Sequence, residues 1–454
     1  MEAQTTTRDG LLRRTRAYSY KGPIAASLAA ALMAVAACQE RSPTALGDSQ
    51  LPEEPLTIEV ELPWSEFGSD FQVLGGYGSV ASLGSPVLAH TFAGALESRV
   101  LVRFGAYPIS AQVINADGAA ELDTDIRYIG GSVVLTIDTA ASTNTGPVTL
   151  QLGALEEVWD VGTASWTYAV DTIADQRAWA QPGAGPATQI SAAFWDPAMG
   201  DTVSFPLDSA SVALWVDNAD QSRGGRIESD TDGVLLKLTR AVLRVTLRSS
   251  IDPDTIVVDS VPLIEGTIVY DPPPSTPVGL RAGGAPAWRS IMGITVPTLT
   301  GPPELCAAVG CPFTPEPGQI SYAALALTSR TTEAGFQPRD TVRLDVRSVL
   351  SPPALPKSPL GPSETGGLGT SILPEVFGAL EGSVVEVPIT AFVRTLLSGP
   401  GAGGVAGVDP PSTLALTSAT EPFSLSFASF FGPAEPGEPV LKLILTVGTP
   451  QELP

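Results

Sequence analysis

Residues 57–62 read Thr-Ile-Glu-Val-Glu-Leu, so apolar and charged side chains alternate along the segment. Successive side chains of a β-strand point to opposite faces, and this alternation is typical of a strand with one buried face. The chain also has 45 glycines and 42 prolines, which form turns and interrupt helices. Short helices are favoured at residues 208–215 and 389–397. Further strand-like segments lie at residues 99–104, 132–138, 202–205, 242–247, 341–346 and 440–447, and several of them alternate apolar and polar side chains in the same way. The sequence therefore predicts an all-β protein.

Two pairs of landmarks indicate an internal repeat. Arg99 and Pro206 lie 107 residues apart, and Arg289 and Pro388 lie 99 residues apart. In each pair an alternating segment comes first, and a proline-containing segment then leads into a predicted helix. Similar landmarks at similar spacing are typical of related domains in tandem. We predict two antiparallel β-sandwich domains, at residues 56–260 and 261–454.

Residues 1–37 have the composition of an export signal. Residues 1–22 carry five basic and two acidic side chains, and residues 24–37 are uncharged and mostly apolar. Fourteen residues rise about 21 Å as a helix, too short for a hydrocarbon core of about 30 Å. Residues 35–38 read Val-Ala-Ala-Cys, which resembles the lipobox of bacterial lipoproteins. The resemblance implies cleavage before Cys38 and lipidation there; an ordinary secretory signal is the alternative.

A lipid on Cys38 implies a mature protein held on a membrane of the cell envelope. Gln39 follows the cysteine, which in lipoproteins of two-membrane bacteria favours the outer over the inner membrane. Residues 38–55 are polar and include three prolines, so they are predicted to form a flexible tether.

The charge of the mature chain limits its partners. Residues 1–37 hold 5 of the 25 basic and 2 of the 48 acidic residues, which leaves 20 against 46 and a net charge of −26. A field of this sign repels nucleic acid. The sequence predicts no nucleic-acid partner, and it does not fix an oligomeric state.

The two remaining cysteines, Cys306 and Cys311, are predicted to form a disulfide. Export exposes them to oxidants, and four intervening residues can bring their Cα atoms within bonding range. A metal site would need further ligands, and the chain has a single histidine, His90. We therefore predict a local disulfide and no cofactor, apart from the calcium alternative below.

The order of segments resembles that of DNRLRE-type domains, which are jelly-roll modules of secreted bacterial proteins. The matching segments of the first half are residues 99–104, 159–166, 179–183, 203–215 and 233–238. In the second half they are residues 289–297, 385–397, 427–429 and 439–443, without the tryptophan-rich stretch. The resemblance implies a jelly-roll-like fold for both domains and, for some such modules, polysaccharide binding.

Trp159, Trp166 and Trp179 are the candidate ligand-binding residues. Exposed indole rings stack on the apolar faces of sugars, so the three favour a polysaccharide platform. The alternative is that they fill the core of the sandwich, where large aromatic side chains dominate burial.

Glu228, Asp230 and Asp232 are the candidate metal ligands. Acidic side chains at alternate positions are common in calcium loops, but the terminal glutamate of a complete calcium loop is missing. A structural calcium ion and a solvated turn therefore both stay open.

No catalytic residues are predicted. A serine triad would need His90 as its base, and His90 lies in a predicted strand without a Gly-x-Ser-x-Gly motif. The sequence favours a non-catalytic surface binding or scaffold lipoprotein with polysaccharide as the candidate ligand. The alternative is a carbohydrate-active enzyme with paired carboxylates, although no pair stands out.

Overall fold

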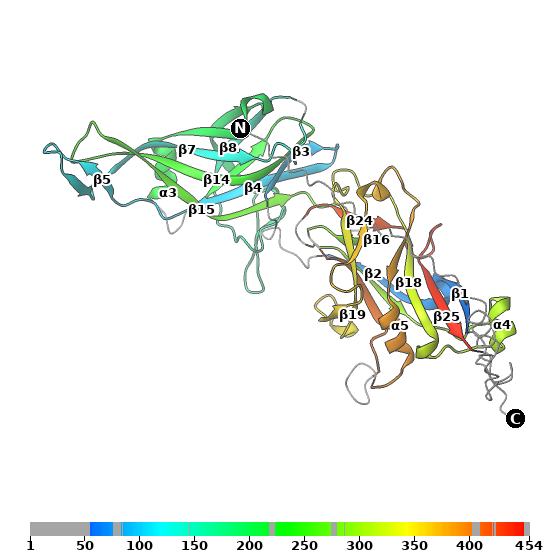
Figure 1. Cartoon of the computed structure of the whole chain (residues 1–454). Helices are drawn as coiled ribbons and strands as arrows, with labels where there is room; N and C mark the ends of the chain where they lie inside the picture. Colours follow the sequence, from blue (N-terminus) through cyan, green and yellow to red (C-terminus); the bar gives the residue numbers. More distant parts are fainter. Residues whose placement is uncertain are drawn as a thin grey trace, which may run out of the picture. The chain divides into compact units, whose positions relative to one another are not determined.

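The structure of the chain is a computed structural model in which strands take up 49% and helices 11% of the residues. It describes residues 55–448 apart from residues 76–82, 84, 145, 218–222, 274–278, 286, 402–408, 420 and 422–423. The all-β prediction is confirmed, and the antiparallel sheets are consistent with a β-sandwich (Figure 1). Both predicted helices are also confirmed, as α3 (Ser209–Val216) and α5 (Thr390–Leu397).

Strands between residues 87 and 270 form one large antiparallel sheet with the order β11-β8-β13-β4-β15-β14-β7-β12, and β3 pairs with β14 and β4. The elements of this first group are β3 (Val87–Phe92), β4 (Leu96–Phe104), β5 (Ala111–Ile114), β6 (Ala120–Asp123), β7 (Arg127–Ile137), β8 (Val148–Leu155), β9 (Tyr168–Asp171), β10 (Gln176–Ala178), β11 (Ala187–Trp195), η3 (Pro197–Met199), β12 (Thr202–Asp208), α3, β13 (Gly225–Ser229), β14 (Val234–Arg248) and β15 (Ile256–Tyr270).

Two long strands, β14 and β15, allow this sheet to fold over on itself. The first half of β14 pairs with β3 and its second half with β15, while β4 pairs with both β3 and β15. The four strands therefore close a ring. Register shifts between Leu238 and Arg240 and between Leu263 and Glu265 lie where the pairing changes partner. Such bulges bend a strand, so each long strand serves two layers.

The remaining strands form a second group of sheets. One sheet has the order β1-β25-β18-β22, and another has the order β2-β17-β23-β19-β20, with β21 beside β19 and β16 paired to β24. The elements are β1 (Leu56–Pro63), α2 (Trp64–Phe67), β2 (Gly68–Leu74), β16 (Leu280–Gly283), β17 (Arg289–Ile294), α4 (Pro303–Val309), η5 (Pro317–Gln319), β18 (Ile320–Thr328), β19 (Val342–Val349), η6 (Pro352–Ala354), β20 (Leu360–Ser363), β21 (Thr370–Ile372), η7 (Pro374–Phe377), β22 (Val384–Pro388), α5, β23 (Thr413–Ser418), β24 (Phe427–Phe430) and β25 (Val440–Val447).

The first strands of the described chain pair with strands of its second half. Leu56 lies opposite Val447 at one end of the β1–β25 ladder, and β2 pairs with β17. A division into domains at residues 56–260 and 261–454 stays a prediction. Strand pairing nevertheless places residues 56–74 with the later group, which local sequence patterns do not reveal.

The predicted landmarks Pro206 and Pro388 occupy similar places. Pro206 lies in β12 and Pro388 in β22, each strand ends its hydrogen-bonded order, and each leads into an eight-residue helix. A proline lacks an N–H group and is therefore tolerated at a sheet edge. The similarity between the two halves at these landmarks is that each has an edge strand with a proline followed by a short helix.

Each group of sheets encloses apolar side chains. The first core includes Phe104, Phe205 and Trp215, and the second includes Phe67 and Phe377. Side chains after residue 280 also join the first core, since the rings of Tyr270 and Phe336 lie 6.2 Å apart and those of Phe336 and Phe427 lie 5.8 Å apart. The two groups therefore share apolar contacts at Tyr270, Phe336 and Phe427.

The predicted disulfide is confirmed. Cys306 and Cys311 are joined with their Cα atoms 4.9 Å apart, and they close the loop around the end of α4. Gly310 ends that helix with a φ of +81°, a conformation that side chains with a Cβ rarely adopt. The predicted signal peptide, the lipidation site Cys38 and the tether as far as residue 54 lie outside the described residues.

Candidate functional site

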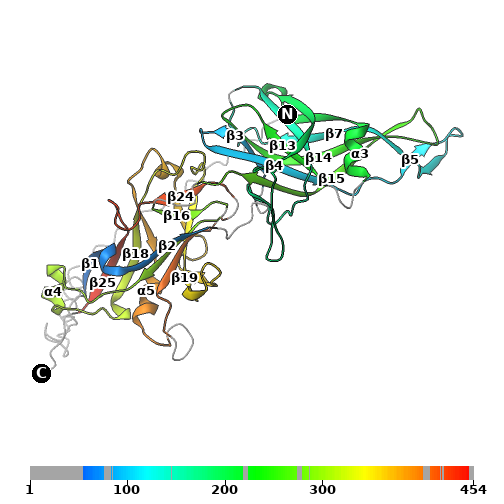
Figure 2. The same cartoon turned by 180° about the vertical axis from the view of Figure 1, so that it is seen from behind.

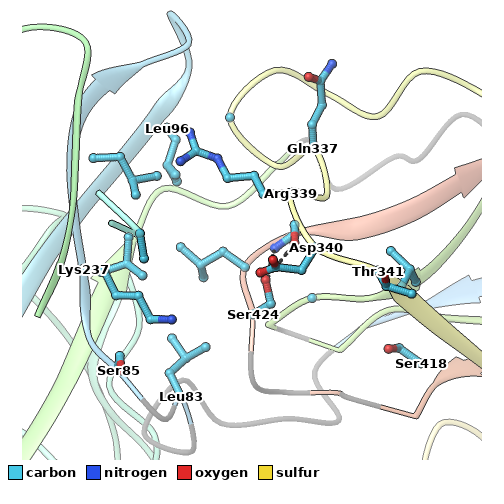
Figure 3. A pocket seen from close by; sticks show the side chains of 18 of the residues that line it. Leu83, Ser85, Leu96, Lys237, Gln337, Arg339, Asp340, Thr341, Ser418 and Ser424 are labelled. Carbon is cyan, nitrogen blue, oxygen red and sulfur yellow. Dashed lines mark hydrogen bonds between the residues drawn. The ribbon is translucent and has the colours of Figure 1, made fainter. Parts of the chain in front are cut away.

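A cavity of about 370 Å³ lies where strands of the first group meet segments of the second. Its apolar wall includes Leu96 on β4 and Leu235 on β14, and its opposite wall includes residues 339–342 before and at the start of β19 (Figure 3). Polar groups of the lining include Ser85, Lys237, Gln337, Arg339, Asp340 and Ser424. We take this cavity as the candidate ligand site.

Lys237 places a cation in the cavity because of the alternation along β14. Leu236 and Leu238 point into the core, so Lys237 faces the other way and is only half-buried. In Figure 3, Lys237 and Asp340 reach into the cavity from opposite sides. Within the described parts of the chain, the Lys237 ammonium makes no ion pair. An unpaired ammonium beside apolar side chains is a ready partner for an anionic ligand group.

Arg339 fixes the opposite wall. Its Nη1 donates a hydrogen bond of 2.7 Å to Thr143 Oγ1, and its guanidinium lies 4.6 Å from the centre of the Phe92 ring. Burial lowers the pKa of Arg339 from its usual value, although a guanidinium stays charged at neutral pH. The contacts hold residues 337–341 against β3, so the cavity has a positioned wall on each side.

The chemistry of the lining favours binding of a hydroxylated ligand. The Oγ atoms of Ser424 and Ser426 lie 2.7 Å apart, and Gln337, Ser85 and Thr341 add further hydrogen-bonding groups. Among the described lining residues, Asp340 is the one carboxylate and none has an aromatic ring. General acid–base hydrolysis of a glycoside needs two carboxyl groups. The lining therefore offers recognition groups without that pair.

The predicted platform of three tryptophans is largely buried. Trp159 and Trp179 are 3% and 5% exposed, and their Nε1 groups donate to the carbonyls of Arg223 and Ser165. Trp166 is half-buried beside them and packs against the same small core. Rings with covered faces cannot stack on a sugar, so the burial favours the core alternative for Trp159 and Trp179.

Arginines from the sheet fasten this tryptophan-rich segment. Arg103 lies 4.5 Å from the centre of the Trp159 ring, and Arg99 lies 5.1 Å from that of Trp166. Arg99 Nη1 also donates to the carbonyl of Gly183, where a Cβ would lie 2.6 Å from that nitrogen. The glycine of the Trp-Ala-Gln-Pro-Gly stretch therefore permits the close approach. Sequence reasoning placed the tryptophans together but missed the arginines that cover them.

The three candidate metal ligands are not gathered around one point. Glu228 pairs with Arg99 at 3.0 Å and with Arg226 at 2.5 Å, while Asp230 accepts from Gln151. Asp232 accepts from Thr91 instead. Among the described residues, no group of three or more His, Cys, Asp and Glu side chains is placed to hold a metal. Asp230 and Asp232 are exposed and fit the solvated-turn alternative, whereas Glu228 is a partly buried residue of β13.

His90 lies between two carboxylates. Its Nδ1 is 3.0 Å from Glu97 Oε2, and its Nε2 is 3.5 Å from Asp232 Oδ1. Both ring nitrogens thus lie beside a carboxylate oxygen, and neither contacts a serine hydroxyl in the described chain. This arrangement ties β3 to β4 and to the loop before β14, as a structural contact does.

Comparison of the chain with models of protein families and with curated proteins finds no match. No helix among the described residues is long and apolar enough to cross a membrane.

Proposed function

We propose that this chain is a lipid-anchored, extracytoplasmic binding protein, and that the cavity beside Lys237 holds its ligand. The ligand is a hydroxylated molecule with one anionic group, such as the acidic end of a saccharide. The N-terminal segment supports the anchoring, and Gln39 favours the outer membrane. The observation that carries the ligand proposal is the unpaired ammonium of Lys237 among hydroxyl and apolar groups.

The balance of charge in the cavity supports an anionic group on the ligand. Lys237 and Arg339 bring two cations against the single carboxylate of Asp340. In a chain with a large acidic excess, such a local reversal of charge favours an anionic group at the cavity. Asp340 and the serines then suit hydroxyl groups on the remainder of the ligand.

Binding to the mature chain tests the ligand proposal. We expect a panel of acidic and neutral saccharides to contain members that raise the melting temperature, with the acidic ones favoured. Lys237→Met should weaken binding of those members about tenfold or more, because a charge-assisted hydrogen bond is lost. Lys357→Met is the matched control, since Lys357 is an exposed lysine elsewhere in the chain. Equal affinities of the two variants would contradict the proposal.

The carbohydrate-active enzyme remains the second candidate, and it makes a different prediction. An enzyme would release reducing ends from a polysaccharide, and replacement of a carboxylate pair would stop the release. We expect no release and a ligand that is recovered unchanged. Turnover that disappears with Asp340→Asn would overturn the binding proposal in favour of catalysis.

Lipid anchoring has its own test. We expect the full chain to label with palmitate and to fractionate with membranes, and the Cys38→Ser variant to do neither. The basic residues 1–22, the uncharged apolar residues 24–37 and the Val-Ala-Ala-Cys end at residues 35–38 motivate this expectation. A Cys38→Ser variant that still carries label would refute it.

A further inference from the structure

One strand of the first sheet carries a row of arginines. Arg240, Arg244 and Arg248 lie at every fourth position of β14, so they share one face. Leu243, Val245 and Leu247 between them are buried on the opposite side; Arg127 on β7 lies directly opposite Arg248 and joins the row. We call these four residues the arginine face. It lies over β7, β14 and β15, which run side by side (Figures 1 and 2).

The arginine face has no internal neutralisation. None of its four guanidinium groups makes an ion pair or a side-chain hydrogen bond with any part of the chain that the structure describes. Eight other arginines do make ion pairs, at positions 99, 103, 177, 226, 281, 289, 330 and 347. Arg223, Arg339 and Arg394 also make no ion pair within the described chain, but each donates to a carbonyl or hydroxyl oxygen. What distinguishes the arginine face is that four unpaired guanidinium groups lie together on two adjacent strands.

Apart from Arg127, the residues that pair with Arg244 and Arg248 on the adjoining strands carry hydroxyl or apolar side chains. Arg244 lies between Ser132 and Ser260, and Arg248 lies beside Ile256. Ile256 and Val258 on β15 are 55% and 63% exposed. The one acidic side chain at an outward position of the adjoining β12 is Asp208, and it already caps α3 by accepting from Ser211 N. The face thus combines cations with exposed apolar side chains.

The spacing indicates a partner with many anionic groups. Four residues of strand span about 13 Å, so the row on β14 extends over about 26 Å, and Arg127 gives it a second dimension. A single small anion meets at most one or two of these groups. A planar array of phosphates meets all of them, and the exposed Ile256 and Val258 suit the apolar boundary beneath lipid headgroups.

We infer that the arginine face docks on an anionic lipid bilayer. It rests on the proposed lipid anchoring only for the presence of a membrane nearby. Each arginine close to an anionic membrane strengthens binding by about fivefold. The acidic remainder of the protein opposes this beyond a Debye length of about 8 Å, so contact is local. An anchored chain is held at high effective concentration, and weak docking then sets which face meets the lipid.

Vesicle sedimentation of the mature chain with Cys38→Ser tests the inference without the lipid or the cavity ligand. We expect binding to vesicles of about 30% phosphatidylglycerol in phosphatidylcholine, weaker binding to pure phosphatidylcholine, and release at about 0.5 M salt. Replacing Arg240, Arg244 and Arg248 by Gln should weaken binding at least about tenfold, while replacing them by Lys should retain most of it.

A second triple variant controls for net charge. Arg177→Gln, Arg343→Gln and Lys357→Gln remove the same three charges from exposed positions elsewhere, and this variant should bind the vesicles like the parent. Equal binding by both Gln variants would overturn the inference. So would binding to polyglutamate or single-stranded DNA in preference to the vesicles, or a shift to dimer caused by the arginine face. Because the protein used here lacks its lipid, failure of this test is separate from failure of the anchoring proposal.

Discussion

Two sets of arginines in the same sheet differ in burial and in ion pairing. Arg99 and Arg103 on β4 and Arg226 on β13 lie under the tryptophan-rich segment, each with a carboxylate partner. Arg244 and Arg248 on β14 lie in the open with none. Burial without a partner is costly for a charge, so the first set has to be satisfied internally. The exposed set is hydrated and is free to meet an external partner.

The difference separates arginines that hold the structure from exposed arginines that the proposal assigns to recognition. Arg99 shows the structural kind: its Nε lies 3.0 Å from Glu228 Oε2, and burial is the main cause that lowers its pKa. An arginine that is half-covered, paired and stacked on an indole holds a segment in place. The predictions below test this division, which fails if both sets respond alike to mutation.

Glu228→Gln should have the largest effect. Glu228 accepts from both Arg99 and Arg226, so its loss leaves two partly buried cations close together. Breaking a buried pair costs about 3–5 kcal/mol, and the partial exposure of these side chains places the expected loss near about 3 kcal/mol. Urea unfolding measures it, with Asp230→Asn as the neighbouring control. A loss no larger than that of the control would mean that the tryptophan-rich segment holds without its arginines.

Arg103→Gln should come next, at about 2 kcal/mol. The change removes the stacking of the guanidinium on Trp159, its hydrogen bond to the Trp159 carbonyl and its ion pair with Glu265. Tryptophan fluorescence should shift at lower urea than the global transition, because the segment loosens first. An unchanged urea midpoint would place Arg103 with the exposed set.

The pH dependence of stability tests the role of Asp123, a buried carboxylate near the arginine face that is hydrogen-bonded to serines. Asp123 is 2% exposed and accepts from Ser249, Ser250 and the N–H of Ser250, not from Arg248. The bond from Ser249 and these further hydrogen bonds hold the pKa of Asp123 well below its usual range. A depressed carboxyl pKa gives stability that is present above about pH 4 and is lost as the pH falls through the folded value.

Asp123→Asn should therefore lose stability at neutral pH and should flatten the acid side of the profile below about pH 4. Thermal melts of parent and variant between about pH 2 and pH 7 measure this difference. Parallel profiles would show that the carboxylate is not specially stabilised in the folded chain.

Arg244→Gln and Arg248→Gln should have the smallest effect on stability, within about 0.5 kcal/mol in urea unfolding. Arg248 lies opposite Arg127, so its removal relieves a like-charge pair and can even raise stability slightly. If either variant lowered the free energy of unfolding by more than about 1 kcal/mol, the arginine face would have a structural role and would not differ from Arg99 and Arg103.

The local elements of this fold follow from local patterns. Alternation predicted β1, a strand-like apolar run predicted β25, and the short helices α3 and α5 begin within one residue of the predicted positions. Elimination predicted the Cys306–Cys311 bond, because the mature chain offers no other pair. These features depend on a few neighbouring residues, which is why sequence alone reaches them.

Long-range features were beyond that reasoning. The pairing of β1 with β25 depends on which strand edges meet, and an alternating pattern fits many partners. Lys237 and Asp340 face one cavity from segments about 100 residues apart, without a shared motif. Tryptophan burial was left open for the same reason, because covering Trp159 needs Arg103 and Arg223 from two other segments.

Under the proposed export, the placement of β25 between β1 and β18 has a consequence for the order in which the strands can pair. A chain that crosses a membrane from its N-terminus delivers β1 first and β25 last, so β1 has no neighbour on that side until the final strand emerges. Residues 87–270 can pair among themselves well before then. Limited proteolysis of a chain stalled after residue 439 should cut near β1 and leave residues 87–270 intact. Protection of β1 at that stage would mean that another strand takes the place of β25.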